Sequence, residues 1–246
     1  MIKIKNPLFI LAAGLLLVAG STFGVATSAQ KADGAKVESV GFSTAKISVK
    51  LEEQQGDTDE DYAKVAWMDT DGTTKSSDLQ FVNLTSIKPG ETYAENLRVV
   101  NDSDYPEYVR VVVRKYWVNA DGKDVNIDPA YITLHRTEDW IEKDSESGEE
   151  VIYYYKNPIG KGEKAQFLNG ISFDKEIGKE KSKTVTTTET SEGKVIESKT
   201  TYEYDGKQFK VEARVDAVQA NSAEDAINAA WGVIPTFSGD TLEDVQ

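Results

Sequence analysis

The chain lacks cysteine altogether, and it has a single histidine, His135, among its 246 residues. Without cysteine no disulfide can form, so a folded body has to be stabilised by burial and backbone pairing. A zinc site built on thiolates or several imidazoles is excluded, and no His-Glu-x-x-His motif is present. A serine triad would have to recruit His135, and no Gly-x-Ser-x-Gly motif accompanies it. We therefore interpret His135 as a structural or surface residue, and we expect no catalytic residue, no metal site and no cofactor.

Basic residues are also few: 28 Lys and Arg stand against 42 Asp and Glu, which gives a formal charge of −14. Without residues 1–29, which hold two lysines and no acidic residue, the formal charge is −16. Because phosphates attract basic patches, this balance argues against nucleic-acid partners and against adsorption to anionic membranes. If copies of the chain assemble, the attraction between them must overcome this repulsion.

The many acidic residues leave two other kinds of site open. Paired carboxylates could serve a glycoside hydrolase, although the sequence singles out no particular pair. Residues 69–72 and 119–124 resemble parts of calcium-binding loops, but neither has the full ligand spacing with a distal bidentate glutamate. Turn formation explains both segments, and weak calcium binding remains the alternative.

Long apolar runs are absent except at residues 8–18. This run is too short for a membrane-spanning helix, which needs roughly twenty apolar residues. Lys3 and Lys5 precede it, and the small residues at 26–29 follow it, as in a secretion signal with its cleavage site. We therefore predict a signal peptide over residues 1–29 and a secreted protein, with an uncleaved amino-terminal anchor as the alternative.

Most of the remaining chain alternates apolar and polar residues, which is typical of half-buried β-strands. Ile47, Val49 and Leu51 share one face of the first such segment. Further strands are expected at residues 79–84, 92–100, 108–118, 140–142, 151–155, 165–173 and 209–215. Turn residues separate these segments, and only one helical pattern occurs. The sequence therefore predicts an all-β fold, an antiparallel β-sandwich rather than a βαβ architecture.

Two segments differ from the other strands. Residues 175–207 are rich in Thr, Lys and Glu, and Ser191-Glu192-Gly193 suits a turn, so we predict a protruding β-hairpin, with a disordered loop as the alternative. Residues 222–231 predict one short C-terminal helix, capped by Ser222 and ended by Gly232. The expected organisation is a signal peptide (1–29), a mobile N-terminal segment (30–43) and a single sandwich domain (44–246) with a hairpin insertion (175–207).

Three blocks of sequence, in order, resemble one known family. The first runs from Phe81-Val82-Asn83 through Lys88-Pro89-Gly90-Glu91 to Tyr108-Val109-Arg110-Val111. The second combines Trp140-Ile141 with Tyr153-Tyr154-Tyr155-Lys156 and Phe167-Leu168, and the third is Val211-Glu212-Ala213-Arg214-Val215-Asp216-Ala217-Val218-Gln219-Ala220 with the helix up to Trp231. Together they are similar to the TasA/camelysin family of secreted fibre proteins from Gram-positive biofilm matrices. The hairpin at 175–207 is not part of that family's pattern.

The resemblance implies a jelly-roll-like sandwich that is exported as a monomer and polymerises at the cell surface or in the extracellular matrix. Its partner would be another copy of the chain, with other matrix or surface proteins as further candidates. In that family the freed N-terminal segment of one subunit adds a strand to the next, a process called donor-strand exchange. Here the candidate donor residues are Ala35, Val37, Ser39, Val40 and Phe42. A flexible terminus is the alternative interpretation.

Two other functions stay open. The consecutive aromatic residues Tyr153, Tyr154 and Tyr155 must face alternate sides of a strand, so some could form an outward row that binds glycan in a monomeric adhesin or carbohydrate-binding module. Core packing explains the same residues without a ligand. Members of the camelysin branch have been classed as metalloproteases, which makes a secreted hydrolase the third alternative, although this chain lacks the residues for a metal site.

Overall fold

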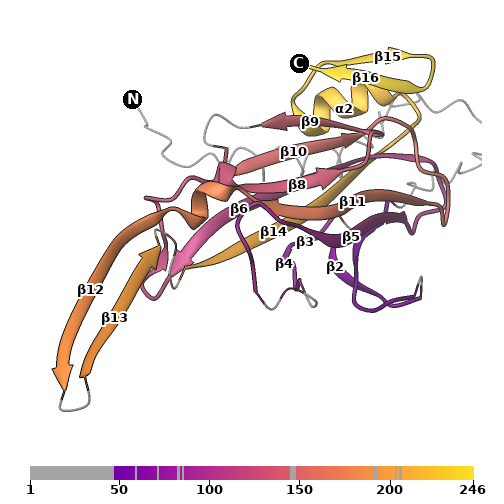
Figure 1. The fold of residues 1–246 in the computed structure, drawn as a ribbon. Helices are drawn as coiled ribbons and strands as arrows, with labels where there is room; N and C mark the ends of the chain where they lie inside the picture. The colour runs from indigo at the N-terminus through magenta and orange to yellow at the C-terminus, as the bar shows by residue number, and fades with distance from the viewer. Residues whose placement is uncertain are drawn as a thin grey trace, which may run out of the picture.

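The structure is a computed structural model that describes residues 47–58, 60–70, 72–81, 84, 86–144, 148–190, 193–202, 204 and 207–246. It is mostly β, with two antiparallel six-stranded sheets, one of which curls into a half-barrel, and with one short C-terminal helix (Figure 1). Its strands are β1 (Val49–Gln54), β2 (Tyr62–Met68), β3 (Thr74–Lys75), β4 (Ser77–Asp78), β5 (Thr92–Asn101), β6 (Glu107–Asn119), β7 (Gly122–Lys123), β8 (Ile132–Arg136), β9 (Trp140–Asp144), β10 (Glu150–Tyr155), β11 (Lys164–Phe173), β12 (Glu180–Thr190), β13 (Gly193–Tyr202), β14 (Gln208–Gln219), β15 (Pro235–Ser238) and β16 (Thr241–Val245). Its helices are η1 (Pro129–Tyr131), η2 (Lys175–Gly178) and α2 (Ala223–Trp231).

The two large sheets follow a strand order that differs from the chain order. The first sheet has the order β3-β2-β1-β5-β11-β8, and the second has the order β4-β14-β6-β10-β9, with β7 paired to β6. The chain therefore crosses repeatedly between the sheets, as in a jelly roll. The predicted all-β sandwich, the short C-terminal helix and the protruding hairpin are all confirmed.

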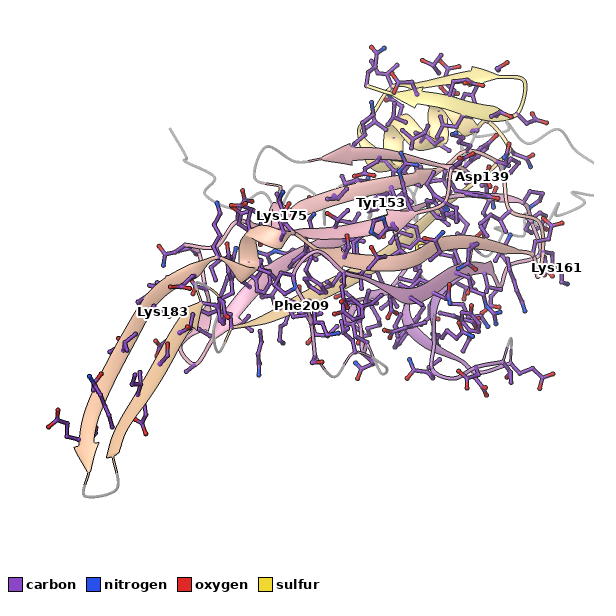
Figure 2. The ribbon with its side chains drawn as sticks, in the orientation of Figure 1. Asp139, Tyr153, Lys161, Lys175, Lys183 and Phe209 are labelled. Carbon is purple, nitrogen blue, oxygen red and sulfur yellow. The ribbon has the colours of Figure 1, made fainter. Side chains whose placement is uncertain are left out.

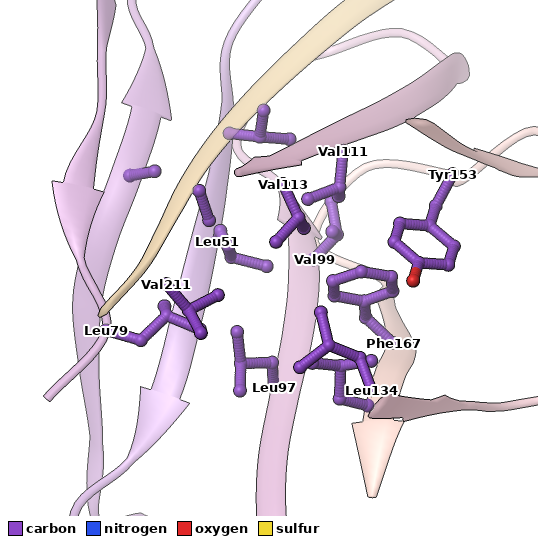
Figure 3. Packing of buried hydrophobic residues seen from close by; sticks show 14 of the residues in the cluster. Leu51, Leu79, Leu97, Val99, Val111, Val113, Leu134, Tyr153, Phe167 and Val211 are labelled. Carbon is purple, nitrogen blue, oxygen red and sulfur yellow. The ribbon is translucent and has the colours of Figure 1, made fainter. Parts of the chain in front are cut away.

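The main core lies between the inner faces of these sheets (Figure 3). Val109, Val111 and Val113 of β6 have no exposed surface, as their alternation with arginine and valine neighbours predicts. They meet Leu51 from β1 and Phe167 from β11, which are also fully buried. Burial of each such side chain contributes roughly 1.5–3 kcal/mol, so this layer supplies most of the stabilisation that a chain without disulfides needs.

A second, smaller core lies on the outer face of the second sheet. Here α2, β15 and β16 pack together at the end of the molecule opposite the hairpin (Figure 1). The rings of Tyr154 and Trp231 lie 5.6 Å apart, and the Tyr108 hydroxyl donates to the Asp240 carbonyl oxygen. The sequence did not predict β15 and β16, because each is short and only the Gly239-Asp240 turn between them marks a hairpin.

A predicted strand at residues 79–84 is wrong. Only β4, just before it, pairs with a neighbour, and the described residues of the 79–84 segment are not in a strand. The N–H groups of Gln80 and Phe81 instead donate to the fully buried carboxyl group of Glu53, each at 2.9 Å. Phe81 has a φ of +45°, a value that an extended strand does not permit. The segment is thus a crossing between sheets, held by a side chain from β1.

The predicted helix is confirmed, but its predicted N-cap is wrong. Ser222 occupies the cap position with a φ of +56°, and its side chain makes no capping hydrogen bond. The acidic residues Glu224 and Asp225 lie in the first turn, where they interact favourably with the helix dipole. Gly232 ends the helix as predicted, with a φ of +69° and an N–H that donates to the Asn228 carbonyl oxygen.

Candidate functional site

The outer edge of β14 is the candidate site for assembly. β14 pairs with β6 along all of its 12 residues. On the opposite edge, β4 pairs only with Glu212 and Ala213. Among the residues that the structure describes, no strand pairs with this edge over residues 214–219. The second sheet therefore ends, at one margin, in a long strand that its short neighbour covers only in part.

The backbone of β14 offers hydrogen-bonding groups along this edge. The Val211 carbonyl oxygen points away from β6, because it accepts the Leu79 N–H at 2.9 Å. In an antiparallel ladder every second residue points the same way, so Val215 and Ala217 also direct their backbone groups outward. Their side chains lie in the core, with exposed fractions of 0% and 6%. The outward backbone groups of such an edge can pair with an added strand.

The chain enters the sandwich near the C-terminal end of β14. The Ser48 N–H donates to Glu107 Oε1 at 3.3 Å, and the Ser48 carbonyl oxygen accepts the Asp102 N–H at 2.9 Å. Glu107 lies opposite Gln219, the last residue of β14. The segment that precedes Ile47 therefore begins near the β6 residue that pairs with the last residue of β14.

Glu107 is an ionisable group at this junction. Its side chain has no exposed surface, and burial raises its pKa from 4.5 to about 7 against the opposing effect of hydrogen bonds from Ser103 and Ser48. The nearby carboxylate of Asp102 raises this pKa further. Oε2 of Glu107 has no hydrogen-bond partner in the part of the chain that the structure describes. The group that holds Ser48 thus changes its charge near neutral pH.

Asn101 fixes the turn that brings Glu107 into place. Its side chain is fully buried, and Nδ2 donates to the carbonyl oxygens of Tyr105 and Ile159 at 2.7 and 2.8 Å. Its Oδ1 atom accepts the Ser103 N–H at 2.7 Å. The Asn-Asp-Ser-Asp stretch that contributes to the family resemblance is therefore a side-chain-stapled turn between β5 and β6.

The predicted donor residues lie outside the described part of the chain. This holds for Ala35, Val37, Ser39, Val40 and Phe42, and for the whole of the predicted signal peptide and N-terminal segment. The structure describes the edge that would receive a strand and the point at which the leading segment joins the sandwich.

A buried pair of carboxyl groups lies at the crossing between the sheets. Burial raises the pKa of Glu95 to about 8, and the adjacent Glu53 raises it further by its charge and by a hydrogen bond between the two side chains. Because Glu53 also accepts the N–H groups of the crossing segment, the proton of Glu95 helps to hold that segment in place. The sequence analysis missed this pair, although Glu53 follows Val49 and Leu51 on the core-facing side of β1.

Two of the residues considered for metal binding, His135 and Asp124, make ordinary side-chain contacts. His135 is half-buried on β8, with Nε2 2.8 Å from the Ser172 hydroxyl oxygen. In the 119–124 segment, Asp124 Oδ2 accepts a hydrogen bond from Lys207 Nζ at 2.6 Å. This bond lowers the pKa of Asp124 to about 2. Within the described ranges, no three His, Cys, Asp or Glu side chains lie close enough together to hold a metal ion.

The aromatic residues of interest divide between the two cores. Trp117, Trp140 and Tyr153 are buried in the main core, and Tyr154 is buried in the second. The half-buried Tyr155 ring packs on Trp140 at 5.0 Å. Tyr116, in contrast, lies on the outer face, where its hydroxyl hydrogen-bonds to Glu212. Tyr153, Tyr154 and Tyr155 therefore do not form an outward aromatic row.

None of the helices in the described ranges is long and apolar enough to cross a membrane. Comparison of the chain with protein-family models, with curated proteins and with solved structures finds no match.

Proposed function

We propose that this protein is a secreted structural subunit of extracellular or biofilm-matrix fibres, in which residues 30–43 of one copy add a strand to the β14 edge of the next copy. The observation that carries the proposal is the edge of β14 at residues 214–219, with which no described strand pairs, together with the entry of the leading segment near the end of that strand. In this proposal the protein has no catalytic role.

The dimensions and the charge of the two surfaces support this arrangement. The uncovered part of β14 spans roughly 20 Å at about 3.3 Å per residue, and the leading segment is long enough to cover it. Residues 30–43 contain two lysines and two acidic residues and so have no net charge. A neutral segment can approach a strongly acidic body with little electrostatic cost.

The same segment can also keep the protein monomeric before assembly. The leading segment joins the sandwich near the end of β14, so in this proposal it covers the edge of its own copy before assembly and keeps the protein monomeric. Exchange of this segment between copies then makes a head-to-tail contact, which repeats without closing and so builds a filament. The pairing is the same in the two forms, and only the copy that supplies the strand differs.

The test is deletion of residues 30–41 from the secreted chain, with electron microscopy and circular dichroism as readouts. We expect a folded β-rich monomer that forms no fibres, because the sandwich keeps its core and loses the donor strand. The single substitution Val125→Ala, at an exposed position outside the donor segment and β14, is the control and should leave fibre formation intact. Normal fibres from the deletion variant would refute the proposal, and glycan binding by the purified monomer would favour the adhesin alternative.

A further inference from the structure

The β12–β13 hairpin extends from the body of the molecule, and the fibre model above does not use it (Figure 1). Its two strands pair with each other from Glu180–Tyr202 to Thr190–Gly193, and within the described residues no further strand pairs with either of them. The side chains that the structure describes on the hairpin, including the labelled Lys183, lie outside the packed body (Figure 2). Two-stranded ribbons are marginally stable in water, so a partner strand would stabilise this one.

The hairpin carries no net charge, unlike the rest of the chain. Residues 175–207 contain seven lysines and seven acidic residues, so the formal charge of −16 belongs entirely to the remainder of residues 30–246. β12 alone spans roughly 35 Å at about 3.3 Å per residue. This reach exceeds the Debye length of about 8 Å at physiological ionic strength. When two copies meet through their hairpins, their acidic bodies can therefore stay farther apart than the Debye length. Salt then screens most of the repulsion between them.

In β12, Lys181 and Glu189 lie at equal distances on either side of Val185 and carry opposite charges. We propose that two copies of the protein join through β12, which pairs antiparallel with β12 of the second copy about a two-fold axis at Val185. In this register Lys181 lies opposite Glu189 of the second copy, and Glu189 lies opposite Lys181 of the second copy. Opposite charges placed directly across two strands are favourable, and a two-fold contact provides this pair twice.

Apolar side chains occupy the centre of the same contact. Val185 lies opposite Ser198 within the hairpin, and Ile196 lies opposite Thr187, so Val185 and Ile196 share one face. Their exposed fractions are 56% and 65%, which is unusual for large aliphatic side chains. In the paired form Val185 meets its own counterpart, and the two Ile196 side chains flank them. Contact between these side chains covers apolar surface that the single chain leaves in water.

The absence of cysteine from the chain makes a direct test possible. In Val185→Cys protein, expressed from the full-length sequence, mild oxidation should produce a disulfide-linked dimer. Thr187→Cys is the matched control, because this position is on the same strand and face but lies roughly 13 Å from its counterpart in the proposed register. Efficient cross-linking of Val185→Cys alone supports the proposal. Equal cross-linking of both variants, or of neither, would overturn it.

A charge-exchange series tests the register in solution without a covalent bond. Lys181→Glu places like charges opposite each other twice and should weaken dimerisation on the order of tenfold in sedimentation equilibrium. The double variant Lys181→Glu/Glu189→Lys restores both pairs and should recover the affinity, whereas loss of affinity in both would contradict the register. Repeating the measurement in the chain that lacks residues 30–41 separates this contact from donor-strand assembly. The hairpin dimer should persist there even though fibres do not form.

Discussion

A fully buried carboxyl group, that of Glu107, holds the backbone N–H of Ser48 at 3.3 Å, across 59 positions of sequence. Glu107 also pairs through its own backbone with the last residue of β14. One ionisable side chain thus connects the entry point of the leading segment with the strand that we propose receives such a segment. A change in the charge of Glu107 should therefore affect both Ser48 and the end of β14.

Glu107→Gln tests this connection. Since burial raises the pKa of Glu107 to about 7, the amide resonance of Ser48 should titrate with a midpoint near that pH in nuclear magnetic resonance spectra. Glutamine keeps an oxygen that can accept the Ser48 N–H but does not ionise, so the titration should disappear in the variant. A Ser48 resonance that titrates equally in both proteins would show that another group is responsible.

Glu95→Gln should make the protein more stable at alkaline pH. The pKa of Glu95 in the folded protein, about 8, lies above its ordinary value of 4.5. The protonated Glu95 side chain therefore stabilises the folded state fully below pH 4.5, and this stabilisation is lost as the pH rises to about 8. Glutamine can still donate to Glu53 and does not ionise. We expect the free energy of unfolding to be similar in the two proteins near pH 5 and on the order of 3 kcal/mol greater in the variant at pH 9, as measured by urea unfolding.

Glu91→Gln is the matched control for this comparison, because Glu91 is an exposed carboxylate near the start of the same strand. Its pH profile of stability should follow that of the unmodified protein. If Glu95→Gln leaves the pH profile of stability unchanged, no proton on Glu95 bonds the two carboxyl groups.

Asn101→Ala should destabilise the fold by about 3 kcal/mol, because three hydrogen bonds of a fully buried side chain are lost and the Ser103 N–H loses its acceptor. The measurement is the urea unfolding midpoint and slope. Asn169→Ala, at an exposed position on β11, should change stability by less than about 0.5 kcal/mol. Equal effects of the two substitutions would contradict the stapled-turn interpretation.

Trp231→Ala tests the second core. The indole packs on Tyr154 and lies 5.2 Å from the guanidinium of Arg110, so its removal should cost roughly 3–5 kcal/mol. Loss of the near-ultraviolet circular dichroism signal at a lower temperature than in the unmodified protein would show this. Ile234→Ala, where the side chain is 60% exposed, is the control and should leave the unfolding temperature nearly unchanged.

Strands with clear alternation could be predicted from the sequence, because the pleat converts period two directly into one buried face. Val109, Val111 and Val113 show this relation on the face toward the main core, whereas Arg110 between them is buried on the other face, beside Trp231. The segment at residues 79–84 was mispredicted for the same reason: Leu79 and Phe81 alternate and both pack against the core, yet the N–H of Phe81 donates to the Glu53 side chain from β1 and not to a neighbouring strand. Such a contact depends on residues distant in sequence, which local patterns do not report.

The candidate assembly edge could not be predicted, since an edge is defined by the order of strands in a sheet. The third block of the family resemblance, at residues 211–220, does coincide with β14, but nothing in it indicates that β4 covers only two of its residues. The buried ionisable residues could have been predicted more easily than this edge. Glu53 and Glu95 both occupy core-facing positions of their strands, and a search for charged residues at such positions would have found them.

Amide hydrogen exchange at Val215 and Ala217 tests donor-strand addition to β14 most directly. In the chain without residues 30–41 these two amides should exchange rapidly, whereas those of Asp216 and Val218, which point toward β6, should exchange slowly. In fibres of the complete secreted chain all four should be protected. Fibres in which Val215 and Ala217 still exchange rapidly would contradict the account.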